Sequence, residues 1–550
     1  MEGGRAGIWR AARIIMTMAP FSRTFIDLVR EQVQRAPDAL ALVCIQGRFT
    51  YQDLASRAAR VAGALKRGGV VRGDRVGILL SNRVEWLDVA LGAGAIGAVI
   101  VPLSTWSTRS ELAGLLKDAR LTLLVAAANF NASNFEADLL ALHDTPHIPA
   151  NGNIWLIEGK GTHFPSYADR LEQADDLAPL PPGESASAGD DAMVLYTSGS
   201  TSTPKAVPLR QYAVLENGYN IGERQGLTSA DRVLLAAPLF WAFGSANALP
   251  ATLTHGATLV LMEKFDAGLA LQVIEQERCT AIYTLPAMTA ALVNHPNYRL
   301  DKLASLRTGL TIGSSDDFLF AVEKLGCASL CNVYGATETC GNCTVTWHHW
   351  PLLRRAYSQG PPLPGQQIRF VDEITGEPSI PGTPGLAEVL GYTTSGYSGD
   401  SAQQNAKAFT SDGFYRTGDM GLINADGDFV FVGRVSEMIK RAGINVSPAE
   451  VEEVLKRHPS VREAAVVGVP DASRGELIFA YVVPVSEDMF NAQTLKLHCA
   501  AEASKYKLPD HIECCAALPL TVTGKLQRSE LKKMALKRAQ ELSDIAVLSS

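Results

Sequence analysis

Residues 192–205 read Ala-Met-Val-Leu-Tyr-Thr-Ser-Gly-Ser-Thr-Ser-Thr-Pro-Lys, a short apolar run followed by a turn rich in hydroxyl groups. The run predicts a buried strand, because apolar residues stand together and the polar turn ends them. Six of the ten residues from Tyr196 to Lys205 are Ser or Thr, and the last is a lysine. Hydroxyls and backbone N–H groups in a turn form a concave anion site, to which a lysine adds a point charge. The stretch therefore predicts a strand that leads into a phosphate-binding loop, although the Walker spacing is absent.

Helical and strand patterns alternate along the chain on both sides of this stretch. Amphipathic helices are predicted from Phe25 to Val33 and from Leu54 to Leu65. Buried strands are predicted at residues 76–80, 99–101, 121–125 and 233–236. Such alternation implies an α/β fold, with a large N-terminal domain of mostly parallel sheets covered by helices.

The pattern changes near residue 436. The elements expected beyond it are a helix, two strands and a second helix, at residues 448–456, 464–469, 478–483 and 495–503. This segment has the size of one folding unit and predicts a small α+β domain. The expected division is an N-terminal extension, a large domain and a small C-terminal domain, over residues 1–17, 18–435 and 436–550.

Composition excludes several classes of protein. The 550 residues carry a net charge of −7, and general nucleic-acid binding requires a broad basic surface instead. No segment has the roughly 20 apolar residues that a membrane span needs. The nine cysteines have no regular spacing, which favours a reducing compartment, and we expect a cytoplasmic protein. Arginines among apolar residues at positions 1–17 leave an organelle-targeting segment open, but an upstream start before Met18 is preferred.

Three more motifs follow the hydroxyl-rich turn. They read Asn-Val-Tyr-Gly-Ala-Thr-Glu at residues 332–338, Tyr-Arg-Thr-Gly-Asp at 415–419 and Leu-Pro-Leu-Thr-Val-Thr-Gly-Lys at 518–525. In this order, the four motifs resemble those of the adenylate-forming enzymes, which include acyl-CoA synthetases, firefly luciferase and peptide-synthetase adenylation domains. The resemblance runs from about residue 25 to residue 530. Ser202 and Ala206 stand where the family has glycine, which puts the efficiency of the ATP step in doubt.

The resemblance implies an ATP-dependent carboxylic acid–CoA ligase. Such an enzyme forms an acyl-adenylate with release of pyrophosphate and then transfers the acyl group to coenzyme A. ATP, Mg²⁺ and coenzyme A are the implied cofactors and co-substrates.

Cofactor-binding residues are carried over from the family to matching positions. The nucleotide is expected on the hydroxyl-rich turn and on two serines, namely Thr197, Ser198, Gly199, Ser200, Thr201, Lys205, Ser314 and Ser315. Tyr334 would stack on adenine, as a flat aromatic ring can, and Asn332 would meet the adenine amino group. Asp419 would accept hydrogen bonds from the ribose hydroxyls, and Arg434 would hold the ribose and help to neutralise the phosphate.

Three residues are expected to take part in the chemistry. Thr337 would contact the α-phosphate. Glu338 would bind Mg²⁺, because a hard dication prefers carboxylate oxygen. Lys525 would bridge the attacking carboxylate and the α-phosphate, where it would neutralise developing charge.

The acid is expected to bind beside Pro-Leu-Phe-Trp-Ala-Phe-Gly at residues 238–244. The pocket residues expected here and on neighbouring loops are Phe240, Trp241, Phe243, Gly244, Gly313 and Gly335. An aromatic wall favours an uncharged aliphatic or aryl acid over an amino acid. Two observations keep this open: Asp316 and Asp317 could hold an ammonium group, and the aromatic residues could be ordinary core.

The thioester step is expected to use a second pose of a mobile C-terminal domain. Ser436 matches the hinge, where the family usually has Asp or Lys, so the balance between the poses is expected to shift. Ala442 and Gly443 match the residues that line the pantetheine tunnel. The nucleotide end of coenzyme A could be attracted by Lys440, Arg441, Lys505 and Lys507. Two alternatives stay open: an enzyme that loads a separate phosphopantetheinyl carrier protein, and a relative that catalyses only one half-reaction.

Overall fold

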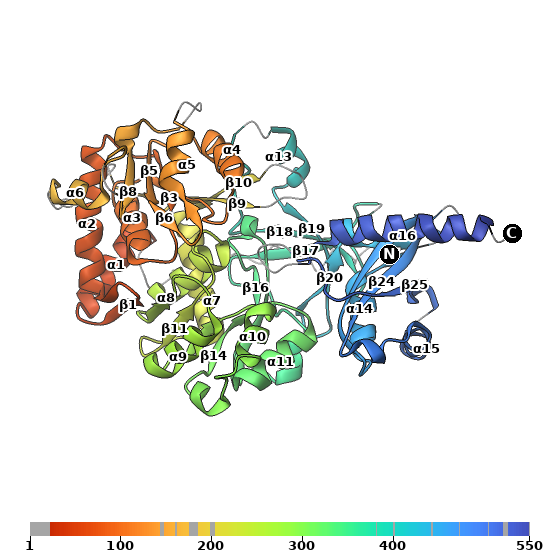
Figure 1. The fold of residues 1–550 in the computed structure, drawn as a ribbon. Helices are drawn as coiled ribbons and strands as arrows, with labels where there is room; N and C mark the ends of the chain where they lie inside the picture. The colour runs from red at the N-terminus through yellow and green to blue at the C-terminus, as the bar shows by residue number, and fades with distance from the viewer. Residues whose placement is uncertain are drawn as a thin grey trace, which may run out of the picture. The chain divides into compact units, whose positions relative to one another are not determined.

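The computed structural model describes most of the chain (Figure 1). The described ranges are 23–143, 148–159, 162–174, 185–197, 204–373, 375–380, 382–399, 402–441, 444–471, 474–503, 505–520 and 526–548. Several predicted features lie outside the described residues, namely the extension 1–17, the centre of the hydroxyl-rich turn from Ser198 to Thr203, Ala442, Gly443 and Lys525.

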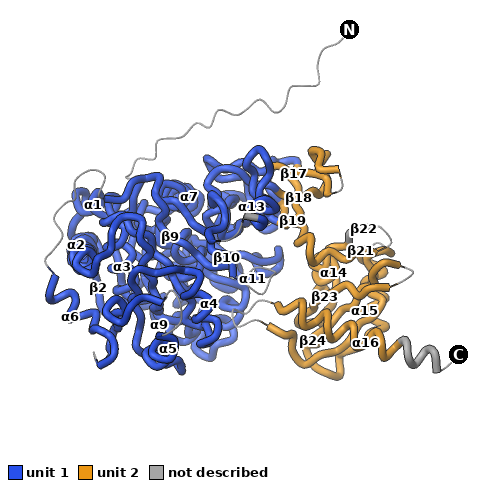
Figure 2. The backbone as a smooth tube through the Cα atoms, turned by 90° about the horizontal axis from the view of Figure 1, so that it is seen from above, with its two compact units in different colours: residues 1–368, 388–417, 425–429 blue, residues 369–387, 418–424, 430–550 orange. Residues whose placement is uncertain are grey.

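The chain forms two compact units (Figure 2). The first comprises residues 1–368, 388–417 and 425–429. The second comprises residues 369–387, 418–424 and 430–550. The domain boundary that the sequence indicates at residue 436 and the separate extension 1–17 stay predictions.

The largest sheet has eight strands in the order β16-β15-β14-β13-β11-β12-β1-β2. Its central strands run parallel, and each outermost strand pairs antiparallel with its neighbour. In sheet order the strands span Thr344–Val345, Ser329–Tyr334, Thr308–Thr311, Ala281–Tyr283, Arg232–Leu235, Thr258–Leu261, Leu40–Cys44 and Gly47–Thr50. The mostly parallel architecture that the sequence predicts is confirmed.

A second sheet in the same unit has six strands in the order β10-β9-β4-β3-β5-β8. In that order the strands span Lys205–Arg210, Asp191–Thr197, Val99–Pro102, Arg75–Leu79, Leu123–Ala127 and Ile154–Ile157. All pairs are parallel except β9 with β10, where the chain reverses through the hydroxyl-rich turn. A small antiparallel ladder joins β6 (Asn129–Phe130) to β7 (Ser133–Asn134).

Helices cover both faces of the eight-stranded sheet, because its strands are apolar on both sides. Within β11 and β12, Val233 and Leu259 belong to one apolar core, whereas Leu234 and Val260 belong to another. Consecutive side chains of a strand point to opposite faces, so each strand supplies both cores. The core shared with the six-stranded sheet includes residues of α1 (Phe25–Arg35), α2 (Tyr51–Arg67), α3 (Val84–Ala95), α4 (Arg109–Ala119), α5 (Phe135–Ala141), α7 (Gln211–Gln225) and α8 (Leu249–Thr254). The opposite core includes α9 (Ala267–Glu277), α10 (Pro286–Val293) and α11 (Ser315–Leu325).

Local sequence signals set several helix starts. The Thr50 side chain accepts a hydrogen bond from the backbone of Asp53, whose carboxylate accepts one in return from the Thr50 backbone N–H, and this capping box begins α2. The first two predicted helices, at residues 25–33 and 54–65, are confirmed with small shifts of their ends.

The second unit contains the small α+β arrangement that the sequence predicts. A five-stranded sheet joins β22 (Ile444–Val446), β21 (Ile439–Arg441), β24 (Gly475–Pro484) and β23 (Val461–Asp471) in that order, and β25 (His511–Cys514) pairs with β24. Its helices are α14 (Pro448–Lys456), α15 (Ala492–Glu502) and α16 (Arg528–Leu548).

A further sheet has the order β17-β18-β19-β20, with strands at Gln367–Val371, Gly385–Leu390, Tyr415–Ile423 and Phe429–Arg434. The first unit contains the remaining helices, α6 (Tyr167–Glu172), α12 (Leu352–Ala356) and α13 (Ala402–Ala408).

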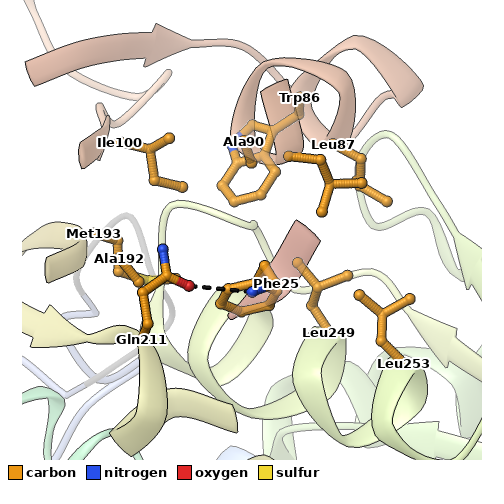
Figure 3. Close-up of a pocket in the computed structure, with 11 residues that line it drawn as sticks. Phe25, Trp86, Leu87, Ala90, Ile100, Ala192, Met193, Gln211, Leu249 and Leu253 are labelled. Carbon is orange, nitrogen blue, oxygen red and sulfur yellow. Dashed lines mark hydrogen bonds between the residues drawn. The ribbon is translucent and has the colours of Figure 1, made fainter. Parts of the chain in front are cut away.

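An apolar cavity lies in the first unit, beside α1 and α3 (Figure 3). Phe25, Trp86 and Leu253 are among its walls, and the Gln211 amide oxygen accepts a hydrogen bond from the Phe25 backbone at 3.2 Å. The cavity has a volume of about 20 Å³, counted as the space open to the centre of a water molecule. This volume is room for about one water molecule. Because Ile100 and Met193 lie near the amino ends of β4 and β9, the cavity is at the strand edge opposite the hydroxyl-rich turn. It is therefore neither large enough nor correctly placed to hold the acid.

Among the described residues, no helix is both long and apolar enough to cross a membrane.

Candidate active site

The predicted site segments of the first unit follow the carboxyl ends of parallel strands. The segments at Phe240, Gly313 and Glu338 come after β11, β14 and β15, which are parallel strands of one sheet. The hydroxyl-rich turn follows β9 of the other sheet. Parallel strands bring their carboxyl ends to one edge of a sheet, where open α/β folds bind ligands. Topology therefore gathers segments that are up to 140 residues apart in the sequence.

The two ends of the hydroxyl-rich turn are fixed by strand pairing. Thr197 and Lys205 are register partners where β9 pairs with β10. The Lys205 ammonium lies 4.8 Å from the centre of the Tyr397 ring, in a cation–π contact. Ala206, where the family has glycine, is buried in β10, and its carbonyl oxygen accepts a hydrogen bond from Ser398 at 3.0 Å. The turn thus begins and ends beside the segment that contains Tyr397.

The carboxylate of Glu338 lies in the same place. Glu338 is only 7% exposed, and its Oε1 accepts a hydrogen bond from the Tyr397 hydroxyl at 2.9 Å. The Tyr415 hydroxyl lies 3.4 Å from that of Tyr397. Among the described residues, no cationic side chain pairs with Glu338. Carboxylate oxygens are ligands that a hard divalent cation prefers, so this buried group fits such a cation.

Burial and the negative charge of Glu338 raise the pKa of both Tyr397 and Tyr415 above the usual phenol value. Both hydroxyls therefore stay protonated at neutral pH and act as neutral hydrogen-bond donors.

The adenine-binding predictions have different structural settings. The Tyr334 ring is buried and stacks on Phe429, with ring centres 4.3 Å apart and 26° between the planes. The Asn332 amide nitrogen donates to the carbonyl oxygens of Arg355 and Ser358, and its oxygen accepts from the Val333 backbone. Asn332 is thus a buried residue that joins β15 to the segment 355–358. Contact of Tyr334 and Asn332 with adenine stays a prediction.

The two serines after β14 are placed at the start of α11. The Ser314 hydroxyl accepts a hydrogen bond from the Asp317 backbone, and the Asp317 carboxylate accepts from the Ser314 hydroxyl at 2.7 Å and from its backbone at 3.0 Å. This capping box leaves Ser315 at the first helical position. Because Oδ2 of its carboxylate already accepts both bonds of the cap, Asp317 is less available to a substrate ammonium group, which weakens one reason to expect an amino acid.

The aromatic residues of the expected acid pocket divide into two groups. Phe240 and Trp241 both meet the Trp106 ring edge to face, with ring centres 5.3 Å and 5.1 Å apart. Phe243 instead packs against Tyr283, 5.2 Å away. Phe243 begins a π-helical turn, Phe243–Ala248, a rare geometry that often marks functional sites. The predicted wall therefore consists of Phe240 and Trp241 together with Trp106.

Close packing explains three glycines of the predicted pocket, against backbone at Gly244 and Gly335 and against a side chain at Gly313. A Cβ on Gly335 would lie 1.8 Å from the Gly341 carbonyl oxygen, and one on Gly244 would lie 2.6 Å from that of Pro238. Gly313 has a φ of +154°, and a Cβ there would meet Asp317 at 2.9 Å. Each glycine lets two chain segments of the site touch. Whether these residues contact substrate stays a prediction.

The ribose-binding prediction concerns the second unit. The Arg434 guanidinium lies 3.1 Å from Asp419 Oδ1, and the Asp419 carboxylate is buried whereas Arg434 is more than half exposed. The structure therefore brings this predicted pair together. Ser436 is exposed within a short 3₁₀ turn, Val435–Glu437, directly after β20. Its role as a hinge stays a prediction.

Three of the four cations expected to attract coenzyme A have an acidic neighbour in the structure. Arg441 forms a bidentate ion pair with Asp510 and is almost buried. Lys507 pairs with Glu450 at 2.6 Å, and Lys440 lies 3.6 Å from Glu373. Arg441 is thus a structural residue, which the sequence alone did not reveal.

Sequence reasoning missed Tyr397 and Trp106 as members of the site. Tyr397 is 59 positions from Glu338, and no spacing signal connects the two residues. Trp106 follows β4, and its place at the carboxyl end of a predicted parallel strand was the available signal.

Comparisons with known proteins agree with this geometry. Residues 29–397 match the family model described as AMP-binding enzyme, and residues 450–525 match the model described as AMP-binding enzyme C-terminal domain. The putative acyl-CoA synthetase YngI of Bacillus subtilis (strain 168) is 30% identical over 541 residues, which cover 94% of this chain and 98% of the relative. Feruloyl-CoA synthase of an Amycolatopsis species is 32% identical over 506 residues, which cover 91% and 97%. The crystal structure of ATP-bound MatB from Rhodopseudomonas palustris has a TM-score of 0.83 at 26% identity and covers 93% of this chain and 99% of that chain.

The chain therefore belongs to the AMP-binding enzyme family. Within that class it is an ATP-dependent, AMP-forming acid–CoA ligase that works through an acyl-adenylate, as the sequence predicts. The α/β fold with a second, smaller domain is confirmed as well.

Proposed function

We propose that the protein joins an apolar aliphatic or aryl carboxylic acid to coenzyme A. The observation that supports this most is the approach of Lys205, at the end of the hydroxyl-rich turn, to the Tyr397–Glu338 pair. A cation for phosphate and a carboxylate for a metal would thereby share one site, although Lys205 begins β10 of one sheet and Glu338 follows β15 of the other. The resulting site has the charges that a metal–triphosphate requires.

In the first half-reaction, a carboxylate oxygen attacks the α-phosphorus of ATP and pyrophosphate leaves. We propose that Lys205 and the turn hold the phosphates, that Thr337 contacts the α-phosphate and that Lys525 neutralises the charge that develops there. Glu338 would hold Mg²⁺, which when bound supplies charge neutralisation to the phosphates. In the second half-reaction, the thiolate of coenzyme A attacks the acyl carbon and AMP leaves.

The acid class follows from the aromatic group formed by Trp106, Phe240 and Trp241. Aromatic side chains supply apolar contact area and favour planar or extended apolar partners. The name of the Amycolatopsis relative refers to a feruloyl group, which is aryl. Indoleacetate–CoA ligase of Aromatoleum aromaticum, 31% identical over 495 residues that cover 89% of this chain and 94% of the relative, is also named for an aryl acid.

Coenzyme A is preferred to a carrier protein as the acceptor, because these relatives are named as CoA synthases and ligases. We propose that Ala442 and Gly443 line the path of its pantetheine arm, and that Ser436 is the hinge between two poses of the C-terminal domain. A cytoplasmic location is supported by the cysteines: all nine are free, as a reducing compartment requires.

ATP–pyrophosphate exchange across a panel of acids tests the proposal. We expect exchange with apolar aliphatic or aryl acids and thiol loss when coenzyme A is added. Lys525→Ala should lower the exchange rate about 100-fold or more, because it removes a charge that neutralises the transition state. Exchange only with amino acids would refute the substrate class, and undiminished exchange in Lys525→Ala would refute the role of that lysine.

A further inference from the structure

Glu338 accepts two hydrogen bonds from another part of the chain, one at its buried carboxylate and one at its backbone carbonyl. Tyr397 donates to its Oε1, and the Thr394 backbone donates to the Glu338 carbonyl oxygen at 2.7 Å. Both the side chain and the backbone of Glu338 are therefore held by the segment 394–397. The segment 394–397 belongs to none of the four sequence motifs, since it lies between the motifs at 332–338 and 415–419.

Tyr397 has an orientation of its own that does not depend on Glu338. The Asn405 side chain accepts a hydrogen bond from the Tyr397 backbone N–H at 2.7 Å and donates to its carbonyl oxygen at 3.0 Å. The ring is 6% exposed and lies against the Lys205 ammonium. Asn405 is on α13 and Lys205 begins β10, so Tyr397 contacts residues of two elements besides its bond to Glu338.

A tyrosine hydroxyl can orient a metal-binding carboxylate without competing with the metal. A lysine or arginine in its place would neutralise the carboxylate and weaken its attraction for a dication. A neutral O–H occupies one lone pair of one oxygen and leaves the negative charge for the cation. Groups that orient a ligand in this way typically change metal affinity 10- to 100-fold when they are removed.

We propose that Tyr397 is a positioning residue that holds Glu338 for the divalent cation of the nucleotide and connects it with the phosphate-binding Lys205. The inference rests on the proposed function, since it assumes that a metal–nucleotide binds at Glu338. It adds a residue, supplied by the segment before α13, to which none of the four motifs points. The role is separate from catalysis, because Tyr397 acts through Glu338.

The test compares Tyr397→Phe with the wild-type protein by calorimetric titration of ATP at a series of Mg²⁺ concentrations. The variant keeps the ring that contacts Lys205 and loses only the hydroxyl. We expect the Mg²⁺ concentration that half-saturates the enhancement of ATP binding to rise about tenfold or more. ATP binding without Mg²⁺ should be unchanged, which a general loss of structure would not allow.

Tyr51→Phe is the matched control. Tyr51 is also buried, and its hydroxyl donates to the Ala257 carbonyl oxygen at 2.8 Å, within the core shared by the two sheets. This variant should keep the wild-type Mg²⁺ dependence. Asn405→Ala is a second test variant, which removes the support of Tyr397 and should raise the Mg²⁺ requirement in the same direction.

The outcomes separate the inference from the proposed function. Wild-type Mg²⁺ dependence in both Tyr397→Phe and Asn405→Ala would overturn the inference and leave the proposed function intact. ATP binding that is independent of Mg²⁺ in the wild-type protein would refute the metal role of Glu338, and the inference with it. Should Tyr397→Phe fail to fold, as judged by thermal melting without nucleotide, Asn405→Ala alone decides.

Discussion

Substitution of Gly335 by alanine should disable the site with little effect on the rest of the fold. The added Cβ would lie 1.8 Å from the Gly341 carbonyl oxygen and 2.6 Å from the Asn342 Cα, whereas ordinary contacts begin near 3.4 Å. The facing segments must therefore separate by more than 1 Å. Both atoms belong to backbone, which cannot rotate away as a side chain can.

The loop around Gly335 has little freedom to absorb this shift. The Cys343 backbone donates to the Tyr334 carbonyl oxygen, and the Gly341 backbone donates to that of Ala336, both at 2.9 Å. The Cys340 carbonyl oxygen accepts from the side chains of Asn217 and Asn247. The displacement of the backbone at Gly335 should therefore pass to the neighbouring segment 337–338. A misplacement of about 1 Å in a catalytic site costs roughly 100-fold in rate. Overpacking should cost about 1–3 kcal/mol of the free energy of unfolding.

ATP–pyrophosphate exchange and chemical denaturation measure the two effects. Gly114→Ala makes the same chemical change on the exposed face of α4, where an added Cβ meets nothing within 4 Å. This control should keep full exchange activity and gain up to about 1 kcal/mol, because alanine is the better helix former. Exchange at the wild-type rate in Gly335→Ala would refute the argument that backbone contact at this glycine positions the site.

Two further predictions concern the acid pocket and a buried carboxyl group. Trp106→Ala should raise the KM for the acid about three- to tenfold, because it removes an aromatic contact, while the KM for ATP stays the same. Steady-state kinetics with each substrate varied in turn measures this, and equal changes in the two KM values would count against it. Burial raises the pKa of Asp88 to about 6 despite its ion pair with Arg57, so between pH 4 and pH 6 the folded protein binds a proton that the unfolded chain releases. The free energy of unfolding of the wild-type protein, relative to that of Asp88→Asn, should therefore fall by about 3 kcal/mol as the pH rises through this window. Parallel denaturation curves at pH 4, 5, 6 and 7 test this, and a difference that is constant with pH would contradict it.

Much of the fold could be predicted from local pattern. The strand before the hydroxyl-rich turn, the first two helices and the helix at residues 448–456 lie where periodicity places them. Periodicity succeeds there because each element is apolar on the face, or faces, that the sheet covers. The ends of elements were less accurate: the strand predicted at 464–469 extends over Val461–Asp471, because pairing with β24 continues beyond the apolar run.

The site was predictable only in part. Glu338, Lys205 and Asp419 could be named because each lies in a motif of adjacent residues, and Arg434 because it matches a family position. Asp317 looked like a possible partner for an ammonium group, and only the folded α11 shows that it caps that helix. Arg441 looked like a surface cation, and only the pairing with Asp510 shows that it is internal.

The sequence by itself determined the alternation of strands and helices, the family and the motif residues that we propose to bind the nucleotide. Tertiary structure alone decided which side chains contact the motif residues: Tyr397 lies beside Glu338, and Trp106 lies against Phe240. The physical reason is that a motif records residues joined by a short length of chain. Contacts such as these depend on how parallel strands bring distant segments to one edge, and no local pattern records that packing.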